Sequence, residues 1–108
     1  MLNNSDIVQR TILRQREALY QIHNEFGIAR TDLEVLGYAK EKMFFTSYDL
    51  QEYYIHTNIQ QIRRSLRNLT ASNFIKVFSK TQEKKRVYYV ISSKGKQAYY
   101  QYEAIILN

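Results

Sequence analysis

The feature that most constrains the fold is the segment "TNIQQIRRSLRNLTASNFI", residues 57–75, at the centre of a long basic region. It lies within thirty consecutive residues, 53–82, that contain no Asp or Glu. Four aliphatic residues in it recur three or four positions apart. On a helix they would fall within an arc of about 80°, which predicts one buried face: Ile59, Ile62, Leu66 and Leu69.

The opposite face of this predicted helix, residues 57–70, is polar and cationic. We expect Thr57 to cap it, with Gln60 completing a T-x-x-Q capping box. Arginine, glutamine and asparagine form paired hydrogen bonds with base edges, and a carboxylate there would be repelled by phosphates. The alternative is a merely solvated face. The residues that we predict to contact DNA from this helix are Thr57, Asn58, Gln60, Gln61, Arg63, Arg64, Arg67 and Asn68.

The charge of the chain is concentrated in one segment. The formal net charge is +6 and the pI is about 9.6. Residues 1–52 carry −2, residues 53–97 carry +9 and residues 98–108 carry −1. Concentrated positive charge attracts polyanions, of which nucleic acid is the most common in cytoplasm. The sequence therefore predicts a nucleic-acid partner for the middle of the chain.

Two helices are predicted before this region. In residues 5–26 an apolar stripe includes Val8, Ile12, Leu19 and Ile22, with Ser5 as the expected N-cap and Gly27 as the stop. In residues 31–43 we expect Thr31 and Glu34 to form a capping box. Residues 44–45 would form a strand-like link.

A short helix should follow, starting at the T-x-x-D box of Thr46 and Asp49 and running through Tyr54. After the basic helix, Asn73 is suited to a left-handed terminating conformation. Residues 74–92 contain two β-prone runs around "SKTQEKKR", which predicts a hairpin with a basic tip. The tip residues that we predict to contact DNA are Lys80, Lys84, Lys85 and Arg86.

The last segment, residues 93–107, reads as a helix capped by Ser92 or Ser93. Its exposed aromatic and aliphatic surface would be better covered by a second subunit. Together with the first helix it is predicted to form a dimer interface. The residues predicted for that interface are Val8, Ile12, Leu19, Ile22, Ala98, Tyr99, Tyr102, Ile105 and Ile106.

This order of elements predicts one winged helix-turn-helix domain over residues 1–108, mostly α with a small β-hairpin wing (α+β). Residues 46–70 would form the helix-turn-helix, 74–92 the wing, and 5–26 and 93–107 the dimerisation helices. The sequences "LRNLTASNFIKVFSKTQEKKRVYYVISSKG" and "TDLEVLGYAKE" resemble the recognition-helix, wing and preceding-helix patterns of the MarR-like transcriptional regulators. The resemblance covers residues 31–97.

The resemblance implies a homodimer that binds double-stranded DNA and regulates transcription, usually as a repressor. The recognition helices, residues 57–70, would enter successive major grooves, and the wings, residues 79–86, would contact the backbone or minor groove. The chain departs from the family pattern in its short length and in Asn73, where a glycine is expected. SarA-like regulators and plasmid-partition winged helices are near relatives of the same pattern.

Other classes of function find less support. The chain has no cysteine and its two histidines are far apart, so we expect no metal site and no cofactor. No catalytic motif has a supporting context, so we expect no enzyme. We expect a cytoplasmic, nucleoid-associated protein without a membrane partner. A small-molecule effector is possible but not indicated. Two alternatives stay open: a plasmid or phage partition or architectural DNA-binding protein, and a winged-helix protein-interaction module.

Overall fold

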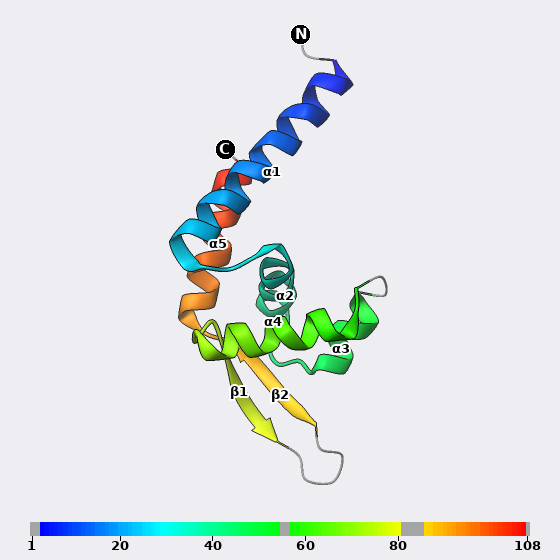
Figure 1. Cartoon of the computed structure of the whole chain (residues 1–108), viewed down its shortest axis with the longest axis vertical. Coiled ribbons are helices and arrows are strands. Elements are labelled where there is room, and N and C mark those ends of the chain that lie inside the picture. The colour runs from blue at the N-terminus through cyan, green and yellow to red at the C-terminus, as the bar shows by residue number, and fades with distance from the viewer. Residues whose placement is uncertain (1–2, 55–56, 81–85, 108) are drawn as a thin grey trace.

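A computed structural model describes residues 3–54, 57–80 and 86–107 of the chain. Within these residues, helices and a two-stranded hairpin follow one another in the order predicted for a mostly α winged helix-turn-helix (Figure 1). The elements are α1 (Asn4–Phe26), α2 (Arg30–Glu41), α3 (Ser47–Tyr53), α4 (Ile59–Ala71), β1 (Ile75–Lys80), β2 (Val87–Ile91) and α5 (Ser93–Leu107).

Helix α1 begins slightly earlier than predicted, because Asn3 caps it instead of Ser5. The side-chain Oδ1 of Asn3 accepts a hydrogen bond from the backbone N–H of Asp6 at 2.9 Å. Gly27 ends the helix as predicted, with a left-handed φ of 72° that disfavours other residues. Its N–H donates to the carbonyl of His23 at 2.8 Å.

The start of α2 corrects the predicted capping box of Thr31 and Glu34. The carboxylate Oδ2 of Asp32 instead accepts a hydrogen bond from the N–H of Ala29 at 2.9 Å, so the helix starts at Arg30. An aspartate in the first turn also interacts favourably with the positive end of the helix dipole.

The predicted capping box at the start of α3 is confirmed. The N–H of Thr46 donates to Oδ2 of Asp49 at 2.9 Å, and the N–H of Asp49 donates to Oγ1 of Thr46 at 3.1 Å. This reciprocal pair satisfies two backbone donors that a helix start otherwise leaves free. At the other end of α3, the hydroxyl of Tyr54 donates to the carbonyl of Glu34 at 2.6 Å and ties α3 to α2.

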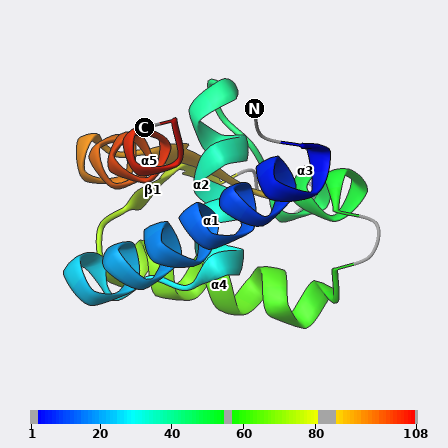
Figure 2. The ribbon, with the colours of Figure 1, turned by 90° about the horizontal axis from the view of Figure 1, so that it is seen from above.

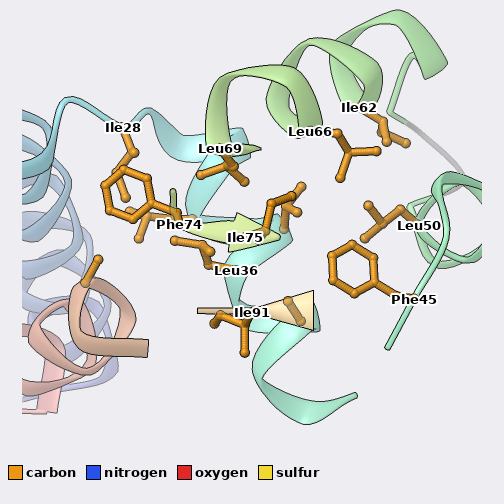
Figure 3. Close-up of a cluster of buried hydrophobic side chains, with 14 of the residues drawn as sticks. Ile28, Leu36, Phe45, Leu50, Ile62, Leu66, Leu69, Phe74, Ile75 and Ile91 are labelled. Atoms are coloured by element: carbon orange, nitrogen blue, oxygen red, sulfur yellow. The ribbon is translucent and has the colours of Figure 1, made fainter. Parts of the chain in front are cut away.

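The core lies beneath α4 and is formed with α2, α3 and the hairpin. Ile62, Leu66 and Leu69 point from α4 into this core, where they are at most 3% exposed (Figure 3). Ile59 packs against the core and is half-buried, so the predicted apolar face of α4 is confirmed. Ser65 is also buried on this face, which the apolar spacing did not indicate.

The turn between α4 and the hairpin depends on Asn73, whose φ of 64° confirms the predicted left-handed terminator. The N–H of Phe74 donates back to the carbonyl of Leu69 at 2.8 Å, and that of Asn73 to Thr70 at 3.1 Å. These bonds close the last turn of α4, since the terminal carbonyls of a helix lack partners within it. The chain then enters β1 directly.

Strands β1 and β2 pair antiparallel, from Ile75 opposite Ile91 to Lys80 opposite Val87. The register shifts at Phe78, which is an extra residue in β1. The predicted strand-like link is a single β-bridge in which Phe45 exchanges two backbone hydrogen bonds with Tyr89, at 3.0 and 2.8 Å. The hairpin is thereby attached to the connection between α2 and α3.

Helix α5 is joined tightly to the start of the hairpin. Ser92 caps it, accepting a hydrogen bond from the N–H of Gly95 at 3.1 Å. The Oγ of Ser92 also lies 2.6 Å from the carbonyl oxygen of Asn73 and 2.8 Å from that of Phe74, to which it donates. A Cβ added at Gly95 would lie 2.2 Å from the carbonyl oxygen of Phe74, so this close approach requires glycine.

The molecule is elongated, with extents of 59 × 27 × 22 Å. Its radius of gyration is 15.5 Å, whereas a compact chain of this length has about 13 Å. Helices α1 and α5 pack together and extend away from the hairpin (Figure 1). Seen from that end, they lie in front of the other helices (Figure 2). The elongation comes mainly from the N-terminal part of α1, where residues 3–14 are all exposed.

Candidate nucleic-acid interface

The polar side of α4 is fully available to solvent. The side chains of Gln60, Gln61, Arg63, Arg64, Arg67 and Asn68 are all exposed. In the described part of the chain the ion pairs are Arg30–Glu34 and Lys40–Glu103, and neither includes an arginine of α4. The guanidinium groups of α4 are therefore not neutralised by carboxylates within those residues, and they can donate hydrogen bonds to an external anion.

The start of α4 differs from the prediction. Asn58, not Thr57, is the N-cap: its Oδ1 accepts a hydrogen bond from the N–H of Gln60 at 2.7 Å. The predicted box of Thr57 with Gln60 is therefore wrong. Thr57 is half-buried just before the helix, where its N–H donates to the carbonyl of Tyr54 at 3.0 Å. Thr57 and Asn58 both still lie at the N-terminal end of α4.

An open cavity of about 640 Å³ lies between α4, the start of α3 and the hairpin. Three arginines line it: Arg63 and Arg67 from α4, and Arg86 from the position directly before β2. The hairpin contributes apolar side chains, including Val77, Val87 and Tyr89. Burial raises the pKa of the Tyr89 phenol. The result is a groove with cationic side chains and a partly apolar wall.

Residues at the start of α3 complete this groove. Thr46, Ser47 and Tyr48 lie on the α3 side, and sequence analysis did not assign Thr46 or Ser47 to the interface. The capping box located this turn, but the spacing could not show that it borders the groove. A hydrogen bond to the carboxylate of Glu52 raises the pKa of the Tyr48 hydroxyl. The Tyr48 ring lies 5.9 Å from the Cζ of Arg86.

The predicted wing residues are only partly described. Lys80 ends β1, and Arg86 is exposed just before β2. Lys84 and Lys85 lie outside the described residues. Arg86 is therefore the tip residue that the structure brings to the groove shared with α4.

The predicted dimer residues fall into two groups. Val8 and Ile12 are exposed, at 56% and 45%. Ile22 and Ala98, by contrast, are 0% exposed within the single chain, where they belong to its core. Their assignment to a dimer surface is therefore corrected: the apolar stripe of α1 is first used to pack α1 on α5. Half-buried residues of the set are Leu19, Tyr99, Tyr102, Ile105 and Ile106.

The apolar stripe of α1 continues beyond this packed part. Ile7, Val8 and Ile12 lie on the same side of α1 as Ile22, within an arc of about 140°. They are nevertheless 45–56% exposed, whereas Ile22 is 0% exposed and belongs to the helix that packs on α5. Ile7, which sequence analysis did not include, thus joins Val8 and Ile12 in one uncovered apolar surface.

A metal site and a membrane-spanning helix find no support in the described residues. Among residues 3–54, 57–80 and 86–107 no group of three or more His, Cys, Asp or Glu side chains could hold a metal ion. No helix in that part of the chain is both long enough and apolar enough to span a membrane.

No protein-family model matches the sequence, and no curated protein matches it. Solved structures do match. The reduced form of MarR from E. coli aligns over 100% of this chain and 79% of its own, with a TM-score of 0.74 and 12% identity. The fold is that of the MarR-type winged helix. The resemblance seen in the sequence thus extends to the architecture.

Some of the similar structures contain DNA. The MepR–DNA complex from S. aureus aligns over 92% of this chain and 81% of its own, with a TM-score of 0.74 and 18% identity. A mutant of MarR from E. coli complexed with operator DNA aligns over 93% of this chain and 71% of its own, with a TM-score of 0.67 and 13% identity. At these identities the likeness concerns the fold.

Proposed function

We propose that the chain is a double-stranded DNA-binding transcriptional regulator that acts as a homodimer. The observation that carries the proposal is the exposed side of α4, where Arg63, Arg64 and Arg67 have no carboxylate partner among the described residues. This side occurs on a fold shared with MarR and MepR, which have been solved with DNA. A helix whose exposed side is basic and whose apolar side is packed on the core is suited to lie in a major groove.

The side chains of α4 divide by their position into two roles. Gln60, Gln61, Arg64 and Arg67 lie on the exposed side and have the hydrogen-bonding geometry to contact base edges. The remaining predicted residues at its borders would contact phosphates and set the register of the helix on the duplex. These residues are Thr57, Asn58, Arg63 and Asn68.

The groove between α4 and the hairpin supports a second contact with the same duplex. If α4 enters a major groove, the hairpin lies beside it along the DNA, and the cavity between them faces the intervening phosphate backbone. Arg63, Arg67 and Arg86 line that cavity, and Arg63 and Arg86 would donate to phosphate oxygens there. Lys80, Lys84 and Lys85 would extend the contact to the next backbone or the minor groove.

The dimer is proposed from the uncovered part of the α1 stripe. The apolar face that the chain buries at Ile22 continues as exposed surface at Ile7, Val8 and Ile12. A second copy could bury this exposed part. Leu107, 78% exposed at the end of α5, adds to the apolar surface at this end. A two-fold pair would present two α4 helices to half-sites about one helical turn apart.

The test compares two variants that remove the same charge from different helices. In one, Arg63, Arg64 and Arg67 become glutamine; in the other, the exposed α1 residues Arg10, Arg14 and Arg16 do. Fluorescence anisotropy with a random duplex at low salt should show binding by the wild-type protein and by the α1 variant, but strongly weakened binding by the α4 variant. Equal losses in both variants would show that net charge alone draws DNA, and no wild-type binding would favour a protein-interaction module.

Footprinting then tests the regulatory role. We expect one protected inverted repeat in the promoter next to the gene, and lower expression of a reporter from that promoter when the protein is present, since repression is the mode implied by the sequence resemblance. A long array of protected direct repeats would instead indicate a partition or architectural protein.

A further inference from the structure

The outer face of the hairpin carries an exposed aromatic cluster that the proposed DNA contacts do not use. Phe44 is 45% exposed and Phe78 58% exposed, yet their rings stack at 4.9 Å with an interplanar angle of 15°. Phe44 also meets Tyr88 edge to face at 6.5 Å. We call these three residues the wing brace. It joins the connection between α2 and α3 to both strands.

The wing brace lies on the side of the hairpin away from the groove. Val77, Val87 and Tyr89 line the groove, and neighbouring residues of a strand point to opposite faces. Phe78 is the extra residue at the register shift in β1, and such bulges redirect a side chain. The bulge thus allows Phe78 to stack on Phe44.

The opposite face of the hairpin is attached to the same short segment. Phe45 forms the β-bridge with Tyr89, and their rings stack at 5.7 Å. Three residues further on, Tyr48 lies beneath Arg86. Residues 44–48 therefore contact the hairpin from both sides, at its base and near its tip.

The contacts of the wing brace affect the orientation of the hairpin more than the stability of the domain. A two-stranded hairpin has little stability of its own, so its angle to the rest of the domain depends on what it packs against. Half-exposed rings add little to the core, but a stacked pair favours one relative orientation by about two- to tenfold. A site built from two elements needs both held at a fixed spacing.

We propose that Phe44 is a positioning residue for DNA binding: through Phe78 and Tyr88 it sets the angle of the hairpin relative to α4, so that both reach one duplex together. This inference rests on the proposed function for its consequence, but the angle itself can be measured without DNA. Phe44 acts through the hairpin and contacts no base or phosphate in this arrangement.

The first experiment measures the angle directly. Because the chain has no cysteine, Gln61→Cys on α4 and Ser79→Cys on β1 give two unique spin-label positions at exposed sites. The distance distribution between the labels should be narrow in the otherwise wild-type protein and clearly broader with Phe44→Ala. Met43→Ala is the matched control, since Met43 is the adjacent residue and is 79% exposed. An unchanged distribution with Phe44→Ala overturns the proposal.

The second experiment measures DNA binding of the Phe44 and Met43 variants without the two cysteine substitutions. With Phe44→Ala we expect affinity to fall about three- to tenfold and the slope of log affinity against log salt to decrease by about one, as a phosphate contact is lost. The discrimination between the preferred site and a site with a changed base under α4 should stay the same. Phe44→Tyr keeps the ring and should restore both affinity and slope.

The outcomes separate the two proposals. If the wild-type protein does not bind DNA, the proposed function fails, and the spin-label distances still decide whether Phe44 orients the hairpin. If Phe44→Ala and Met43→Ala bind DNA alike, the positioning role is wrong even when the protein binds DNA. Should Phe44→Ala fail to fold, Phe44→Leu keeps apolar bulk without the stacking ring and takes its place in both experiments.

Discussion

Helices α1 and α4 are both amphipathic, but the chain buries the apolar face of α4 fully and that of α1 only in part. In α4, Ile62 and Leu69 are 0% exposed and the polar side alone faces solvent. In α1 the apolar stripe is buried at Ile22 and left open at Ile7 and Ile12. The difference separates two kinds of surface. The apolar face of α4 is buried within one chain, whereas the N-terminal half of the α1 stripe is left exposed and would be buried only in the proposed dimer.

The largest effect should come from removing part of the buried apolar face of α4. Leu69→Ala would leave a cavity under α4 and lower the free energy of unfolding by about 2–5 kcal/mol. Urea unfolding followed by circular dichroism measures it. Asn68→Ala, at the neighbouring exposed position, should change stability by no more than about 0.5 kcal/mol. Similar losses for the two variants would mean that α4 is not packed as described.

A charge placed on the open face of α1 should act on association and leave the fold intact. Ile12→Asp would have to bury a carboxylate in an apolar contact, so we expect dimer dissociation to be favoured by about 2 kcal/mol or more, roughly thirtyfold. Analytical ultracentrifugation over a concentration series measures the constant. Leu13→Asp introduces the same residue on the opposite side of α1, where Leu13 is 60% exposed, and should leave the constant unchanged. A shift of equal size there would contradict the proposed interface.

On the polar side of α4, a single arginine should affect sequence preference. Arg64→Ala should cost about 1–3 kcal/mol on the preferred site and much less on random duplex, because a base contact is lost. Anisotropy titrations on both duplexes measure the difference. Lys96→Ala removes an exposed charge from α5 and is the control. Equal losses on the two duplexes would assign Arg64 to phosphates.

The smallest effect is expected from Lys84, for which we predict a contact with phosphates, which every DNA sequence offers. Lys84→Ala should weaken binding to all sequences alike and lower the salt slope by about one. Titrations at several salt concentrations give the slope. An unchanged slope would remove Lys84 from the proposed interface.

The sequence predicted those parts of the fold that depend on local rules. The aliphatic spacing of α4, the box of Thr46 and Asp49, and the left-handed Asn73 each follow from residues close together in the chain, and each is confirmed. Capping was less predictable where several candidates stand side by side. Asn3 and Asn58 cap α1 and α4 in place of the neighbours expected, because the backbone path decides which side chain reaches the free N–H.

The rest depended on contacts between distant segments. A stripe such as that of α1 shows that a face is apolar but does not show what covers it. Ile22 and Ala98 were therefore assigned to a partner, although α1 and α5 of the same chain bury them. The groove lined by Thr46 and Ser47 likewise forms only when the hairpin folds beside α3.

The joint at Ser92 and Gly95 has a consequence for the spacing of an operator. Ser92, the cap of α5, hydrogen-bonds through its Oγ to the carbonyls of Asn73 and Phe74 and through its N–H to that of Phe74, and Gly95 adds a backbone contact that admits no Cβ. This connection allows little movement of α5 relative to α4. A dimer joined through its terminal helices would therefore hold its two α4 helices at one separation and one rotational phase. Inserting a single base pair at the centre of the operator turns one half by about 35° and should break that match.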